Sequence, residues 1–161
     1  MNTLKCPSCG GTLEKEGAVY VCQNCGETFK DKTENFSLQD YTNHFCGTMN
    51  INYCSNNPND AGKDGTVNSI TDIMNWLNNL KQFNENNPFI ILESENAFIQ
   101  TMYESEKQGY VVQKSTVPDI LLQAMYNGTE LLNDVMVQRL FADFYTNTNT
   151  AIGVEWKQVQ Y

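Results

Sequence analysis

Four cysteines near the N-terminus constrain the fold of this chain more than any other feature of the sequence. Two cysteines three positions apart on a tight turn can direct both sulfur atoms at one cation, and a glycine after the second cysteine lets the backbone turn without a Cβ clash. About thirty residues cannot build an adequate hydrophobic core, so metal ligation must supply folding free energy to such a unit. The spacing C-x2-C-x12-C-x2-C is formed by Cys6, Cys9, Cys22 and Cys25, with Gly10 and Gly26 after the second cysteine of each pair.

The residues between the two cysteine pairs predict a β-hairpin. Residues 12–14 and 18–21 have strand-like composition and flank Lys15-Glu16-Gly17, which places Gly17 in the turn. Four thiolates leave no open coordination position, which is typical of structural rather than catalytic zinc sites. The sequence therefore predicts a small metal-stabilised unit over residues 1–32, with Zn2+ as a structural cofactor held by the four cysteines.

With these motifs, residues 4–30 resemble a zinc ribbon, a unit with paired knuckles of the form C-P-x-C-G and C-x-x-C-G-x-x-F. The knuckles here read C-P-S-C-G at residues 6–10 and C-Q-N-C-G-E-T-F at residues 22–29. A rubredoxin-like iron site has a longer, aromatic-rich stretch between its knuckles, and a thioredoxin-like site has a single C-x-x-C at a strand–helix junction. Zinc ribbons in known families commonly contact nucleic acid or protein, and docking on its own chain is the remaining alternative for this one.

Charge is divided unevenly along the 161 residues, which carry a formal net charge of −9. Residues 1–32 hold four basic and four acidic residues, whereas residues 33–161 hold six basic and 15 acidic ones. Binding to a nucleic-acid duplex requires clustered lysine and arginine, so it is disfavoured for residues 33–161. It is not excluded for the neutral N-terminal unit, whose lysines are Lys5, Lys15, Lys30 and Lys32.

The remainder of the chain predicts a polar connection followed by an α+β domain. Residues 33–66 are rich in Asn, Asp and Gly and are expected to form a linker ending in an irregular loop. Residues 67–161 predict a mostly antiparallel sheet with two helices packed on one face. The expected helices begin near Ser69, with Asp72 completing a capping box, and span residues 130–145; the expected strands span residues 89–92, 97–103, 109–113 and 152–157, and residues 119–125 fit either a strand or a helical turn.

Short apolar phrases in this predicted domain resemble those of small bacterial immunity-type proteins of toxin–antitoxin and contact systems. The resemblance implies a protein that acts by binding and blocking a partner. The phrases that carry it are residues 88–93, 98–100, 109–112 and 154–156.

Motifs for catalysis are missing from the sequence. It contains no G-x-S-x-G, no P-loop and no G-x-G-x-x-G. A second metal site or a cysteine–histidine nucleophile pair could be formed by His44, Cys46 and Cys54. No fourth ligand, and no residue that would orient the histidine, lies at a spacing typical of such sites. We therefore expect no catalytic residues and no enzymatic activity.

Three hypotheses about function follow. The first is a binding protein, an inhibitor, immunity-type or regulatory factor, whose acidic α+β domain binds a basic protein partner. The second is a nucleic-acid-associated factor that contacts DNA or RNA through the ribbon, and the third is an enzyme that uses Cys46, Cys54 or His44. The sequence shows neither a signal-peptide h-region nor an apolar run near the roughly 18 residues of a membrane helix, so we expect a cytoplasmic protein without membrane partners.

Overall fold

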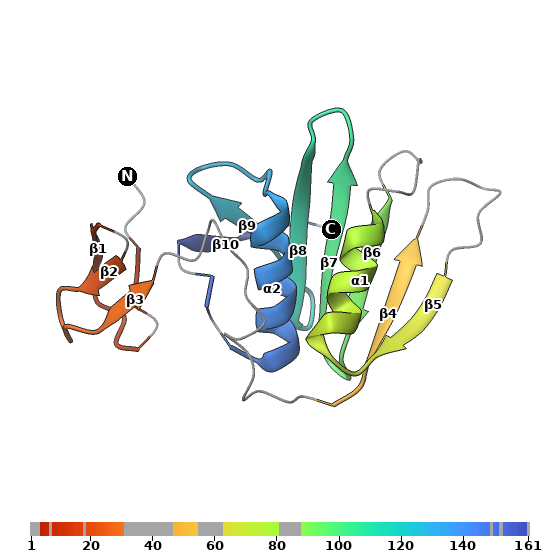
Figure 1. Cartoon of the computed structure of the whole chain (residues 1–161), viewed down its shortest axis with the longest axis horizontal. Coiled ribbons are helices and arrows are strands. Elements are labelled where there is room, and N and C mark those ends of the chain that lie inside the picture. Colours follow the sequence, from red (N-terminus) through yellow and green to blue (C-terminus); the bar gives the residue numbers. More distant parts are fainter. Residues whose placement is uncertain are drawn as a thin grey trace.

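The computed structural model describes residues 4–6, 8–17, 19–30, 47–54, 63–80, 88–148, 150–151 and 153–160. Within them, the N-terminal part forms a small antiparallel sheet of order β1-β2-β3. Its strands are β1 (Leu13–Glu16), β2 (Val19–Cys22) and β3 (Thr28–Lys30) (Figure 1). Gly17 occupies the β1–β2 turn with φ of 64°, which confirms the predicted hairpin.

The rest of the described chain forms a seven-stranded sheet with two helices, so the α+β prediction is confirmed in outline. The strand order is β10-β9-β8-β7-β6-β4-β5, and every neighbouring pair is antiparallel. The ambiguous residues 119–125 belong to a strand, β9, which extends the predicted meander. The elements are β4 (Met49–Cys54), β5 (Lys63–Val67), α1 (Ile70–Leu80), β6 (Phe89–Glu93), β7 (Phe98–Glu104), β8 (Gly109–Val117), β9 (Ile120–Tyr126), α2 (Asp134–Thr146) and β10 (Val154–Val159) (Figure 1).

Two of these strands lie in the stretch that we expected to be an irregular linker. β4 pairs with β6 and β5 pairs with β4, so both belong to the main sheet, and the expectation of irregular structure over residues 33–66 is wrong for them. The physical reason is a period of two, because Ile51 and Tyr53 are buried whereas Asn50 is exposed. Asparagine is depleted in strands, and it conceals this alternation in the sequence.

The two helices begin where side chains satisfy their free N–H groups. At α1 one half of the predicted capping box is present, because Asp72 N donates to Ser69 Oγ (3.1 Å). The Asp72 carboxylate accepts from Asn68 N (3.2 Å), one residue before the cap. At α2 the cap is Asn133, whose Oδ1 accepts from Met136 N (2.9 Å).

The cap at Asn133 corrects the predicted start of the second helix, which was residue 130. Leu132 is paired with Tyr110 of β8 through two backbone hydrogen bonds of 2.8 and 3.0 Å. The backbone around Leu132 is therefore extended along the sheet, and the helix starts only after it.

The hydrophobic core lies between the sheet and the helices. α1 contacts α2, β5 and β6, and α2 contacts β7 and β8. Trp76 and Trp156 are partly buried and pack against this core. That both helices share one face of the sheet stays a prediction. The core side chains include Ile51, Ile73, Leu77, Leu80, Ile90, Leu92, Ile99, Val112, Met136, Val137, Leu140 and Phe141.

Direct cross-strand neighbours give the sheet two chemically different faces. On one face Tyr53, Ile90, Thr101 and Val112 stand in register, and all four are buried; we call it the buried face. The other face is defined by Gln100, Gln113 and Gln123, which also stand in register, and we call it the amide face. A register shift of one residue would exchange the two faces, so the alternation fixes the pairing.

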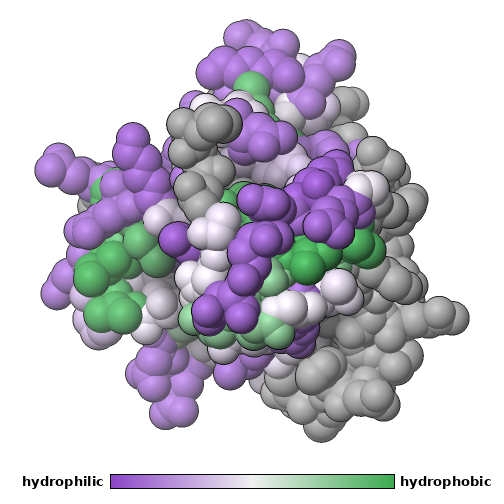
Figure 2. All heavy atoms as spheres, turned by 90° about the vertical axis from the view of Figure 1, so that its left-hand side faces the viewer, coloured by the Kyte–Doolittle hydropathy of each residue, from purple (hydrophilic) through white to green (hydrophobic). Residues whose placement is uncertain are grey.

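The surface that is visible from the side of the small sheet is mainly hydrophilic, with separate hydrophobic groups (Figure 2). Among the residues that the structure describes, Val117 is the one large hydrophobic residue that is exposed, with 52% of its surface accessible to solvent. α1 has 11 residues and α2 has 13, and no helix in the described ranges is long and apolar enough to cross a bilayer.

The core predicts the effect of truncating a buried leucine. We expect Leu92→Ala to lower the free energy of unfolding by about 2–5 kcal/mol, because Leu92 is fully buried and its removal leaves a cavity. The matched control is Val117→Ala, which we expect to change it by less than about 0.5 kcal/mol because Val117 is half exposed. Urea denaturation monitored by circular dichroism measures both, and equal effects would contradict the described core.

Candidate metal centre

The four cysteines are positioned by two turns of the same construction. Cys6 and Cys9 precede β1, Cys22 ends β2, and Cys25 lies in the β2–β3 turn. In the first turn Gly10 N donates to Cys6 O (2.9 Å), and in the second Gly26 N donates to Cys22 O (3.0 Å). Both glycines have left-handed backbones, with φ of 77° and 75°, as we predicted from their place after each second cysteine.

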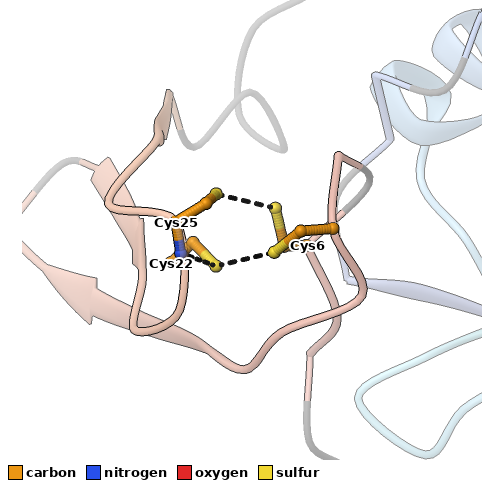
Figure 3. Close-up of side chains that lie close together, drawn as sticks. Cys6, Cys22 and Cys25 are labelled. Atoms are coloured by element: carbon orange, nitrogen blue, oxygen red, sulfur yellow. Dashed lines mark hydrogen bonds between the residues drawn. The ribbon is translucent and has the colours of Figure 1, made fainter.

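The turns bring all four sulfur atoms within 4.8 Å of one another (Figure 3). Cys6 Sγ lies 3.8 Å from Cys25 Sγ, and Cys9 Sγ lies 3.5 Å from Cys22 Sγ. A tetrahedron with metal–sulfur bonds of about 2.3 Å has edges of about 3.8 Å. The four-cysteine cluster therefore fits one tetrahedral metal ion, and its four sulfurs would complete the coordination.

Amide groups around the sulfurs favour their deprotonated form. Cys9 Sγ accepts from Gly11 N (3.4 Å) and from Asn24 Nδ2 (3.5 Å). Cys22 Sγ accepts from the backbone N–H groups of Asn24 and Cys25, both at 3.4 Å. Thiolates are the form of cysteine that binds metals, so these donors prepare the cluster for a cation.

The pKa values show that the sulfurs compete for negative charge. The Asn24 amide and then the Gly11 N–H lower the pKa of Cys9 to about 6. The Cys25 N–H lowers the pKa of Cys22. The pKa of Cys25 is raised to about 12: the Glu27 N–H lowers it, but desolvation and the three neighbouring sulfurs outweigh that effect. Four thiols at these distances can all be deprotonated at the same time only when a cation lies between them.

Gly11 is a residue of the site that the sequence analysis missed. A Cβ atom on Gly11 would lie 2.7 Å from Asn24 Cβ, 3.0 Å from Cys22 Sγ and 3.3 Å from Cys9 Sγ. Only a glycine lets the two turns approach this closely. The two consecutive glycines after Cys9 were the available signal. Gly11 does not have a positive φ, however, and a glycine is required there only because Asn24, distant in the sequence, lies so close.

A small core surrounds the cluster. Cys6 and Cys22 are buried together with Leu13 and Tyr20, whereas Cys9 and Cys25 are exposed. A core of this size cannot hold the unit by apolar burial alone, which agrees with the prediction that metal ligation stabilises it.

One residue of the N-terminal part lies near the larger sheet. Leu4 packs on the small core, and its Cδ2 lies 3.6 Å from where a Cβ on Gly153 would be. Gly153 directly precedes β10, so Leu4 lies close to the start of this strand.

Of the other candidate residues, Cys54 ends β4, far along the chain from the cluster. Burial first, and then the carboxylates of Asp64 and Glu93, raise the pKa of its thiol. A nucleophilic cysteine needs a lowered pKa, so this environment gives no support to the third hypothesis. His44 and Cys46 lie outside the described residues. Within the described ranges, the four-cysteine cluster is the one group of three or more metal-ligating side chains.

Comparison of the chain with protein-family models, with curated proteins and with solved structures found no match.

The geometry predicts the effect of removing one sulfur. We expect Cys22→Ser to lose the bound metal and to unfold residues 4–30, while the larger sheet keeps its cooperative melt. Metal content per chain after dialysis measures the first effect, and far- and near-ultraviolet circular dichroism during heating measures the second. The matched control is Cys54→Ser, which removes a thiol outside the cluster and should leave the metal content unchanged. Equal metal content in the two variants would contradict the assignment.

The close approach at Gly11 predicts a steric effect on the same site. We expect Gly11→Ala to weaken metal binding by about tenfold or more, because the added methyl group separates the two turns. Ser8→Ala, an exposed position in the first turn, serves as the control and should bind as the unchanged chain does. Competition with a chromophoric chelator gives both affinities. Unchanged binding by Gly11→Ala would show that the turns can separate without affecting the ion.

Proposed function

We propose that this chain is a non-enzymatic, zinc-ribbon-containing binding protein, an inhibitor, immunity-type or regulatory factor, whose acidic α+β domain binds a basic protein partner. The observation that carries the proposal is the charge distribution. Residues 33–161 hold 15 acidic and six basic residues, and electrostatic complementarity favours a partner of opposite sign. Long-range attraction also speeds the encounter of oppositely charged proteins.

The choice of zinc rests on the donor set. Four thiolates in a closed tetrahedral arrangement are typical of structural Zn2+, and the sulfur distances of 3.5 and 3.8 Å suit its bond lengths. In the bound state the ion would hold the two turns together, and it would supply no chemistry because no ligand position stays open. The three-stranded antiparallel sheet beside the two knuckles supports the likeness to a zinc ribbon.

The distribution of side chains on the sheet supports placing both helices on the buried face. That face carries the core residues of β4, β6, β7 and β8, and the two helices lie beside each other across the sheet (Figure 1). The amide face would then be available to a partner.

The amide face offers polar groups that suit a protein surface with lysine and arginine. Gln100 donates to Gln113, Gln113 to Gln123 and Gln123 to Glu130, with distances of 2.9, 2.9 and 2.7 Å. These bonds hold the side chains in fixed positions, so less conformational entropy is lost when a partner binds.

A shallow cleft of about 420 Å³ lies at the β4–β5–β6 end of this face. The carboxylates of Asp64 and Glu93 line it, together with Asn50, Asn52 and Thr66. Carboxylates can accept paired hydrogen bonds from a guanidinium group, so a partner's arginine suits this cleft better than an apolar side chain does.

Capture of the partner from the source cells tests the proposal. The full chain and residues 47–161 should retain the same stoichiometric basic protein, identified by mass spectrometry. The shorter piece begins at residue 47 because β4 and β5 belong to the main sheet. Nucleic acid recovered only with the full chain would instead support the second hypothesis, in which the ribbon contacts DNA or RNA.

Electrostatic pairing predicts a rate effect once the partner is in hand. We expect association to slow by about tenfold or more as salt rises from low to physiological strength. Asp64→Asn combined with Glu93→Gln should slow association at low salt, and the control pair Glu14→Gln and Glu16→Gln in β1, which removes the same charge outside the cleft, should slow it less. Stopped-flow fluorescence measures the rates. A rate that is independent of salt would contradict an electrostatic interface.

A further inference from the structure

A cavity of about 410 Å³ lies beside the C-terminal half of α2, away from the amide face. β7, β8 and β10 contribute to its walls, together with the segment that follows α2. Its volume is within the range of small-molecule sites, which are mostly apolar with a few placed polar groups. The residues that matter here are Ile99, Lys114, Thr116, Phe144, Thr148 and Trp156.

Lys114 is an unexpected residue at this position of the sheet. It stands in register with Ile99, and through it with Leu92 and Ile51, all three of which are essentially inaccessible to solvent. The lysine therefore continues an apolar row of the buried face. Burial lowers the pKa of Lys114, and the charge of Asp143 offsets only part of that effect. An ammonium group in such surroundings is costly unless something compensates its charge.

Within the described residues, the compensation is an aromatic ring and not a carboxylate. Lys114 Nζ lies 4.0 Å from the centroid of the Trp156 ring, a cation–π distance. No carboxylate of the described residues lies within ion-pair distance of this ammonium group. Trp156 also lines the cavity, so the charged group and the flat ring border the same space.

The acidic residue of the cavity lining, Asp143, is already engaged by hydrogen bonds within the chain. The Asp143 carboxylate accepts hydrogen bonds from Thr148 Oγ1 (3.0 Å), Thr150 N (2.9 Å), Thr150 Oγ1 (2.7 Å) and Ala151 N (3.0 Å). Four donors fill the acceptor sites of one carboxylate. Asp143 thus fixes the segment after α2, and the ammonium of Lys114 retains the capacity to bind an external anion.

We propose that this cavity binds a small carboxylic acid with a flat apolar body, its carboxylate on Lys114 and its body against Trp156 and Phe144. A monoanion matches the single ammonium group, whereas a phosphate dianion would bring a second charge close to Asp143. The hydroxyl group of Thr116 supplies a further hydrogen-bond donor at the cavity wall. The residues of this cavity differ from those of the proposed partner surface, so this proposal does not depend on the proposed function.

Benzoate is the probe, and benzamide is its uncharged counterpart of nearly the same shape. With the full, metal-loaded chain, calorimetry should show one benzoate per chain, and benzamide and inorganic phosphate should each bind at least tenfold more weakly. The indole N–H resonance of Trp156 should shift on addition of benzoate, while that of Trp76 should not. Equal binding of benzoate and benzamide would overturn the proposal, and this comparison needs no variant.

Variants of the lysine test its role directly. Lys114→Met should lower benzoate affinity at least tenfold, and Lys114→Arg, which keeps the charge, should restore much of it. The matched control is Lys157→Met, because Lys157 is an exposed lysine of β10 adjacent in sequence to Trp156 but outside the cavity lining. Unchanged affinity in Lys114→Met, or an equal loss in Lys157→Met, would overturn the assignment of the carboxylate to Lys114.

Discussion

The larger part of this molecule depends on the register of its antiparallel strands. Tyr53, Ile90, Thr101 and Val112 are direct neighbours across four strands, and all of them are buried. Because side chains alternate along a strand, a slip by one residue in any of these pairs would carry its core residues to the opposite face. The helices can pack on the sheet only while this register holds, and the position of Lys114 between Ile99 and Leu122 in an apolar row follows from the same register.

The sequence was most informative where structure depends on residues close together in the chain. The hairpin at Gly17, the cap that Ser69 forms with Asp72 N and the two cysteine turns all follow from local spacing, and the structure confirms them. The sequence was not sufficient where a partner distant in the chain determines the local backbone conformation. β4 is a strand because β6 pairs with it, and the backbone near Leu132 is extended because Tyr110 binds it, and neither partner is visible in the local pattern.

The candidate sites show the same division. The four-cysteine cluster was predictable because each pair is local and the chemistry of four thiols is specific. Gly11 was missed because the residue that leaves no room for a Cβ atom there, Asn24, lies on the other turn. Lys114 and Trp156 both lie in elements that the sequence at least partly predicts, but their contact joins β8 to β10, which are not adjacent strands. Only the three-dimensional structure brings them to one cavity.

The proposed metal site and the proposed partner are connected through charge. Four thiolates around one divalent ion carry two more negative charges than the ion neutralises, and the formal net charge of −9 does not include them. The charges of the lysines and carboxylates of the N-terminal unit cancel, so this unit would become negatively charged when zinc is bound by four thiolates. Amide donors such as those of Gly11 and Asn24 disperse this charge but do not cancel it. With zinc bound, the proposed ribbon would therefore be less suited to the phosphates of a nucleic acid than its lysines suggest, and it would add to the attraction for the proposed basic partner.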